Sequence, residues 1–238
     1  YKSAEMVEAP AKLRTVLFDK TGTLTVGRPG VSGVVQAPGA SGGEVVRIAA
    51  AVERHSEHPL ARAIVAEAGD SAPESTDFEA IPGLGATANV EGKTVVVGSR
   101  QFLSFHKVNF TPISQDVSSA LLAGETAVLV ARGGALLGMI ALRDKPREEA
   151  AGVVRDLLAS GVKVKLLSGD DGTTAHAVAR EVGISDVLAE VMPPDKAKEV
   201  QVLQQHGDAG AGGVHGIGDS GGRGGHGPTT RALMSLGS

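Results

Sequence analysis

The sequence predicts an α/β protein in which a doubly wound parallel sheet is interrupted by an inserted α+β domain with an antiparallel sheet. An apolar run at residues 15–18 leads directly into Asp19, as a buried strand would. After Asp144 the chain alternates helix-like and strand-like segments, which is typical of parallel sheets. The first strand has no partner nearby in sequence, so we expect it to pair with the C-terminal segments. The expected domains are 1–26 with 144–238, and 27–143 as the insertion.

The individual elements follow from hydrophobic period and from glycine and proline punctuation. Within the insertion we expect helices over residues 44–52 and 60–68 and strands over residues 94–97, 127–131 and 136–142. In the last third we expect helices over residues 147–159, 173–182 and 194–205, and strands over residues 162–167 and 186–189. This alternation is the rhythm of a doubly wound sheet.

Composition narrows the classes of function. The chain has 238 residues, a net charge of −4 and no cysteine, with 42% hydrophobic and 3% aromatic residues. These values exclude a disulfide framework and a thiolate metal site, and they give no basic footprint for nucleic acid or anionic lipid. No apolar stretch approaches the roughly 20 residues of a membrane-spanning helix, so we expect no direct membrane insertion by this chain. Because it begins at Tyr1 without a methionine or a signal-like segment, we expect a piece of a longer protein, in a reducing, cytosolic compartment.

The residues after the first strand carry the main chemical signal. Asp19-Lys20-Thr21-Gly22-Thr23-Leu24-Thr25 places a carboxylate at the carboxyl end of a strand, where open α/β sheets do chemistry. Hydroxyl and backbone N–H groups of the following turn could hold a phosphate against that carboxylate. This heptapeptide resembles the phosphorylation signature of P-type ATPases. An ordinary Asx turn at the strand end would account for its first residues but poorly for the whole heptapeptide.

Two later segments resemble the same family in the same order. Ser168-Gly169-Asp170 closes a predicted strand and is similar to the family's Thr-Gly-Asp, while Pro193-Pro194-Asp195-Lys196 opens a predicted helix and resembles its Pro-x-x-Lys. Taken singly, the first could be a helix N-cap and the second a solvated lysine. Together they resemble the phosphate site of the haloacid-dehalogenase-like superfamily. The resemblance implies catalytic roles for Asp19, Ser168, Asp170 and Lys196.

The insertion carries further motifs of the same kind. Glu53-Arg54-His55-Ser56-Glu57-His58-Pro59-Leu60 resembles the His-Pro element of the heavy-metal-transporting branch of P-type ATPases. Ile81-Pro82-Gly83-Leu84-Gly85-Ala86 and Val97-Gly98-Ser99 resemble that branch's Gly-x-Gly element and the strand pair after it. The resemblance implies adenine contacts from Glu53 and His58, in a nucleotide cleft shaped by Gly83 and Gly85. Asp144-Lys145-Pro146-Arg147 resembles the family's interdomain hinge, which adds Asp144 to the nucleotide-binding residues, although a helix N-cap explains it equally well.

The resemblance weakens after about Gly207. The family continues into Gly-Asp-Gly-x-Asn-Asp, whose first aspartate binds Mg²⁺, and the nearest match here is Gly218-Asp219. The family's Asn and second Asp fall on Gly222 and Arg223, and the composition over residues 207–227 reads as coil. Either the protein is damaged here or the recorded sequence is. The implied Mg²⁺ ligands are Asp19, the Thr21 carbonyl and Asp219.

The resemblance as a whole implies the ATP-binding unit of a heavy-metal-transporting P-type ATPase, a cytoplasmic domain of an integral membrane protein. ATP held by the insertion would phosphorylate Asp19 with Mg²⁺ as cofactor, while Lys196 and Ser168 neutralise the developing charge. The implied partners are the transmembrane and actuator domains of the same full-length transporter. Two alternatives stay open. One is a soluble haloacid-dehalogenase-type phosphatase, which normally carries an aspartate at the place of Thr21; the other is a non-catalytic nucleotide-binding module.

Overall fold

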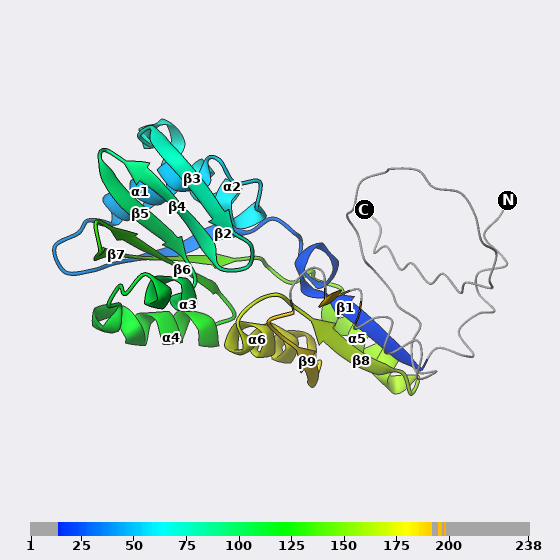
Figure 1. The fold of residues 1–238 in the computed structure, drawn as a ribbon. Helices are drawn as coiled ribbons and strands as arrows, with labels where there is room; N and C mark the ends of the chain where they lie inside the picture. The colour runs from blue at the N-terminus through cyan, green and yellow to red at the C-terminus, as the bar shows by residue number, and fades with distance from the viewer. Residues whose placement is uncertain (1–13, 192–194, 197, 199–238) are drawn as a thin grey trace, which may run out of the picture. The chain divides into compact units, whose positions relative to one another are not determined.

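The computed structural model describes residues 14–191, 195, 196 and 198, which form two compact units (Figure 1). The inserted unit is Gly27–Lys145; the split unit combines the described residues up to Val26 with those from Pro146 onward. The split unit has a parallel sheet and the inserted unit a six-stranded antiparallel sheet, each with its own apolar core. The predicted fold class is therefore confirmed.

In the sheet of the split unit, two neighbouring strands end at the same edge, and a loop begins after each of them. Its described strands run in the order β1-β8-β9, and both pairings are parallel. Asp19, the last residue of β1, is in register with Leu167, the last residue of β8. Because parallel strands end at the same edge, Asp19 and Ser168 lie at neighbouring strand ends. The strands are β1 (Thr15–Asp19), β8 (Lys163–Leu167) and β9 (Asp186–Leu188), and the helices are α5 (Ala150–Ala159) and α6 (Gly172–Val182).

Burial of β1 on both faces explains its unbroken apolar sequence. Val16, Leu17 and Phe18 are all buried, as expected for a strand of a parallel sheet. Val16 and Phe18 join one cluster with Val154 of α5 and Ala179 of α6. This packing holds the carboxyl end of β1 rigidly, so the functional groups after it start from a fixed point.

The inserted unit buries both faces of its sheet. Its strand order is β2-β7-β6-β5-β4-β3. Side chains of β6 alternate between two cores: Val128 and Val130 pack with α1 and α2, whereas Leu129 and Ala131 pack with α3 and α4 (Figure 1). The strands are β2 (Gly30–Gln36), β3 (Ser75–Ile81), β4 (Gly85–Val90), β5 (Lys93–Gly98), β6 (Thr126–Arg132) and β7 (Ala135–Arg143). The helices are α1 (Gly42–Glu53), α2 (Pro59–Ala68), α3 (Arg100–Phe105) and α4 (Ser114–Leu122).

Most expected elements are present, with shifted ends. The helix expected from residue 147 begins at Ala150, and the backbone N–H of Arg147 is bonded to the Leu24 carbonyl. Strands β2, β3 and β4 and helices α3 and α4 were not predicted. The helix expected over 194–205 lies largely outside the described residues, of which 195, 196 and 198 are helical. Among the described residues, no helix has both the length and the hydrophobicity that a membrane crossing requires.

Candidate active site

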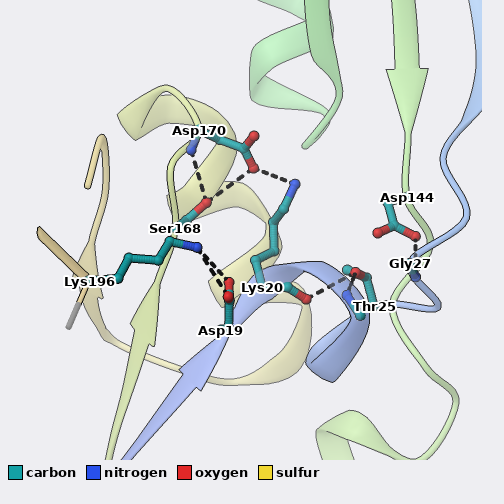
Figure 2. Close-up of polar contacts among 9 residues, drawn as sticks. Asp19, Lys20, Thr25, Gly27, Asp144, Ser168, Asp170 and Lys196 are labelled. Carbon is teal, nitrogen blue, oxygen red and sulfur yellow. Dashed lines mark hydrogen bonds and ion pairs between the residues drawn. The ribbon is translucent and has the colours of Figure 1, made fainter. Parts of the chain in front are cut away.

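Asp19 is held at the end of β1 by a single ammonium group. The Nζ of Lys196 donates to both carboxylate oxygens of Asp19, at 3.0 Å and 3.1 Å (Figure 2). Both side chains are only partly exposed, at 27% for Asp19 and 23% for Lys196. The contact joins residues 177 positions apart in the sequence. It brings together two of the predicted catalytic residues.

The turn after Asp19 closes on itself through Thr25. The backbone N–H and the hydroxyl of Thr25 both donate to the Lys20 carbonyl, at 3.1 Å and 3.0 Å, and the Gly22 N–H donates to the Thr25 Oγ1 at 3.2 Å. Thr25 is completely buried, so its hydroxyl needs these partners. Gly22 has φ +78°, a conformation that glycine adopts without steric cost. The hydroxyls and the glycine of the motif therefore shape the loop that follows Asp19.

Ser168 lies at the end of the neighbouring strand and is bonded to Asp170. Its hydroxyl donates to the Asp170 Oδ2 at 3.1 Å and accepts the Asp170 N–H at 3.1 Å. The N-cap of α6 is Asp171, whose carboxylate accepts the Thr173 N–H at 2.9 Å. An ordinary capping role therefore does not explain Ser168. Its buried hydroxyl remains at a strand end beside Asp19, as a donor for an anion would be.

Lys20 is the residue at this site that the sequence analysis missed. Its side chain is buried, and its ammonium forms an ion pair with Asp170 (Figure 2). Lys20 is the first residue of the turn after β1, and its ammonium pairs with Asp170 rather than with Asp19. A buried charge requires a partner. The pair joins the loop after β1 to the loop after β8.

The donor set at this edge suits a hard cation. Mg²⁺ binds through one or two carboxylates, together with water and substrate phosphate. The Asp19 carboxylate and the Thr21 carbonyl provide such oxygens, and the described residues hold no cluster of three or more metal-binding side chains. Asp219, the third predicted ligand, lies outside the described residues. The oxygens that are present fit Mg²⁺ as an ion shared with a phosphate ligand rather than one caged by protein.

Glu53 and His58 flank the turn between α1 and α2. Glu53 is the last residue of α1 and is half-buried, and burial raises the pKa of its carboxyl to about 7. His58 is the N-cap of α2, and its Nδ1 accepts the Leu60 N–H at 3.2 Å. Pro59 takes the first position of the helix, as expected for a residue without an N–H. The exposed His58 ring and the Glu53 carboxyl, whose pKa is raised, thus lie at the two ends of the short loop between α1 and α2.

The predicted glycines lie at the turn into β4, where backbone approaches backbone closely. Gly83 has φ +76° in this turn. A Cβ on Gly85 would lie 2.3 Å from the Val97 carbonyl oxygen and 2.6 Å from the ring of Phe102, and one on Gly98 would lie 2.4 Å from the Leu84 oxygen. Packing of β4 on β5 therefore already requires glycine at 85 and 98, whatever else these residues do.

Asp144 connects the beginning and the end of the inserted unit. Its Oδ1 accepts the N–H groups of Gly27 and Arg28, at 3.0 Å and 3.2 Å (Figure 2). These residues are the first of the inserted unit, and Asp144 is next to its last. The contact joins the two ends of the insertion, and the hinge role that the motif implies stays a prediction.

Comparisons with known proteins agree on one family. The family profile described as "Hydrolase: haloacid dehalogenase-like hydrolase" matches residues 13–220. The protein named "Probable copper-exporting P-type ATPase V" of Mycobacterium tuberculosis is 42% identical over 210 residues, which is 87% of this chain and 27% of that protein. The chain therefore spans about a quarter of the length of such relatives.

Two kinds of solved structure are similar to the chain. One is the catalytic domain of the CPx-ATPase CopB-B, whose structure concerns its conformational changes upon nucleotide binding. It has a TM-score of 0.65 at 25% identity, covering 89% of this chain and 74% of that one. A zinc-transporting PIB-type ATPase in its E2.Pi state has a TM-score of 0.56 at 38% identity, covering 84% of this chain and 32% of that one. Both similarities extend over most of the present chain.

Proposed function

We propose that this chain, which belongs to the haloacid dehalogenase-like hydrolase family and corresponds to the catalytic region of heavy-metal P-type ATPases, binds ATP and accepts its γ-phosphate on Asp19. The observation that carries the proposal is the position of Asp19. It is a carboxylate at a buried strand end, bonded to Lys196 through both oxygens and next to the Ser168 hydroxyl. Such a group is placed to be a nucleophile toward phosphorus.

The reaction needs little beyond positioning and charge stabilisation. An oxygen of Asp19 attacks the γ-phosphorus, the bond to the β–γ bridging oxygen breaks, and ADP leaves with the electron pair. The Lys196 ammonium neutralises charge on the transferred group, and the Ser168 hydroxyl, which has a single proton, turns from the Asp170 carboxylate to donate to one of its oxygens. Asp170 and Lys20 hold Ser168 and the nucleophile loop in place. Asp19, the Thr21 carbonyl and Asp219 would hold Mg²⁺, which would supply neutralising charge on the phosphates.

Formation of a lasting aspartyl phosphate fits this chain better than phosphatase activity. Rapid hydrolysis requires a general base or acid near the new acyl phosphate. The phosphatase alternative would place a second aspartate at residue 21, where this chain has threonine. A purely nucleotide-binding module would not need a buried Lys20–Asp170 pair and a lysine on the Asp19 carboxylate.

The nucleotide would be held by the inserted unit. Glu53 and His58 on one connection, with Gly83 and Gly85 at the turn into β4, are proposed to contact adenine and ribose, with Asp144 at the base of the unit. A carboxyl whose pKa is raised by burial is typical of a functional site. Backbone without a side chain at Gly83 lets a flat base approach.

The copper- and zinc-transporting relatives suggest the wider context. We propose that this chain is the cytoplasmic catalytic part of a heavy-metal transporter, whose transmembrane and actuator domains are its partners. In that setting, phosphorylation of Asp19 would be the step that drives the transporter between its states.

Labelled ATP tests the proposal directly. The chain incubated with γ-labelled ATP and Mg²⁺ should retain label after acid quenching and lose it in hydroxylamine, as an acyl phosphate does. Asp19→Asn, which keeps the size of the side chain, should abolish labelling while leaving ATP binding by calorimetry unchanged. Rapid multiple turnover without retained label would favour the phosphatase alternative. ATP binding without labelling in the unmodified chain would favour the binding module.

A further inference from the structure

Arg147 contacts the loop after Asp19 through three donors. Its backbone N–H donates to the Leu24 carbonyl at 2.8 Å. The guanidinium donates through Nε to the Thr25 carbonyl at 3.2 Å and through Nη2 to the Gly22 carbonyl at 3.3 Å. The arginine and Gly22 are 125 positions apart in the sequence. One side chain thus spans the second half of the turn that the nucleophile begins.

These contacts supply what the loop cannot supply for itself. Within the loop, the Lys20 carbonyl is paired with Thr25 and the Gly22 N–H with the Thr25 hydroxyl. The carbonyls of Gly22 and Thr25 each accept a side-chain hydrogen bond from Arg147. Carbonyl groups at the end of a helical turn otherwise depend on water or on a cation. A guanidinium suits two such carbonyls because its donors are fixed in one plane.

The neighbouring backbone reinforces the attachment. Thr25 and Pro146 form an antiparallel bridge, so the outgoing chain and the returning chain lie side by side within the split unit. Arg147 follows directly on that bridge. The loop after Asp19 is therefore anchored to the segment by which the chain re-enters the split unit.

We infer that Arg147 is a positioning residue for phosphate transfer: by holding the Gly22 and Thr25 carbonyls it fixes the loop that directly follows Asp19 and carries the Thr21 carbonyl. This inference rests on the proposed phosphorylation of Asp19. Within the described part of the chain, the hydrogen bonds of Arg147 go to the loop and none goes to Asp19, Lys196 or Ser168, so it acts through the loop and not on the phosphate. Misplacement of a reacting group by about 1 Å can cost about 100-fold in rate.

The test compares Arg147→Met and Arg147→Lys with Arg155→Met, a control on α5 whose side chain is 78% exposed. For each full chain, three quantities are measured: the rate of phosphoenzyme formation at saturating ATP, the ATP affinity without Mg²⁺ by calorimetry, and amide hydrogen exchange. We expect Arg147→Met to slow phosphorylation by about 10- to 100-fold, to leave ATP affinity within about twofold, and to speed exchange at the Gly22 and Thr25 amides. Arg147→Lys should be intermediate, and Arg155→Met should match the unmodified chain.

Exchange at β8 separates loop loosening from general unfolding. Unchanged protection of the Leu166 amide, with faster exchange at Gly22 and Thr25, supports a local effect. The inference is overturned if Arg147→Met phosphorylates at the unmodified rate, if the Gly22 and Thr25 amides keep their protection, or if β8 loses protection equally. An unmodified chain that binds ATP and never takes up label refutes the proposed function itself. Faster exchange in Arg147→Met would then assign Arg147 a structural role only.

Discussion

Replacing Glu53 by glutamine should stabilise the protein at neutral and higher pH. Burial raises the pKa of the Glu53 carboxyl from 4.5 to about 7. The folded protein therefore resists ionisation of this group, while the unfolded chain ionises it freely. Glutamine has nearly the same shape and no charge, so it removes the cost of placing a carboxylate at the end of α1.

The size and the pH range follow from the displacement of the pKa. A carboxyl with a raised folded-state pKa does not lower the free energy of unfolding below pH 4.5. Its destabilising effect grows between pH 4.5 and about 7 and is constant above that. One pKa unit corresponds to about 1.4 kcal/mol, which sets a ceiling of about 3 kcal/mol. Because Glu53 is only half-buried, water screens part of this cost, and we expect about 1–2 kcal/mol.

The assay is urea unfolding followed by circular dichroism at pH 5 and pH 8. The gain in unfolding free energy of Glu53→Gln over the unmodified chain should be larger at pH 8 than at pH 5. Glu57→Gln, at an exposed position in the following turn, is the matched control and should show little gain at either pH. The reasoning fails if Glu53→Gln is no more stable than the unmodified chain at pH 8, or if its gain is the same at both pH values.

Three further substitutions test contacts within the two units. Lys20→Met and Asp170→Asn should each lower the unfolding free energy by about 1–3 kcal/mol, because each leaves a partly buried charge unpaired. The double variant should lose less than the sum of the two single losses. Strictly additive losses in urea unfolding would show that the pair is not coupled. His58→Ala removes the N-cap of α2 and should cost about 1 kcal/mol in stability. It should also weaken ATP binding without Mg²⁺, and an unchanged calorimetric affinity would remove His58 from the proposed nucleotide site.

Long buried apolar strands could be predicted from the sequence, whereas the two edge strands of the inserted sheet could not. Strands β1, β5, β6 and β7 are long apolar runs because helices or neighbouring strands cover them. Strand β2, at one edge, is Gly-Val-Ser-Gly-Val-Val-Gln and alternates only between exposed and half-buried positions. Strand β3, at the other edge, is mostly exposed and interrupted by a register shift between Thr76 and Glu79. Neither has the hydrophobic signal on which prediction depends.

The site could be predicted as far as the rule for parallel strand ends reaches. That rule predicts that Asp19 and Ser168 lie at neighbouring strand ends, as the register of β1 and β8 shows. The roles of Lys20 and Arg147 could not be predicted, since their partners are about 150 and 125 positions away and are chosen by side-chain geometry. The order of the elements in the sequence predicts which residues lie at the carboxyl edge of the sheet. It does not predict which charged side chains at that edge contact each other.

The pairing of charges also bears on how the nucleophile is kept ready. Lys196 engages one acceptor site on each oxygen of Asp19, and each carboxylate oxygen has a second lone pair that stays available for attack. An arriving γ-phosphate offers the same ammonium a more highly charged partner, and an ammonium has three donors to divide between the two anions. The Lys20–Asp170 pair keeps a second ammonium from taking the place of Lys196 on Asp19. We therefore expect Lys196 to hold the Asp19 carboxylate oriented before substrate arrives and to share its donors with the γ-phosphate once ATP is bound.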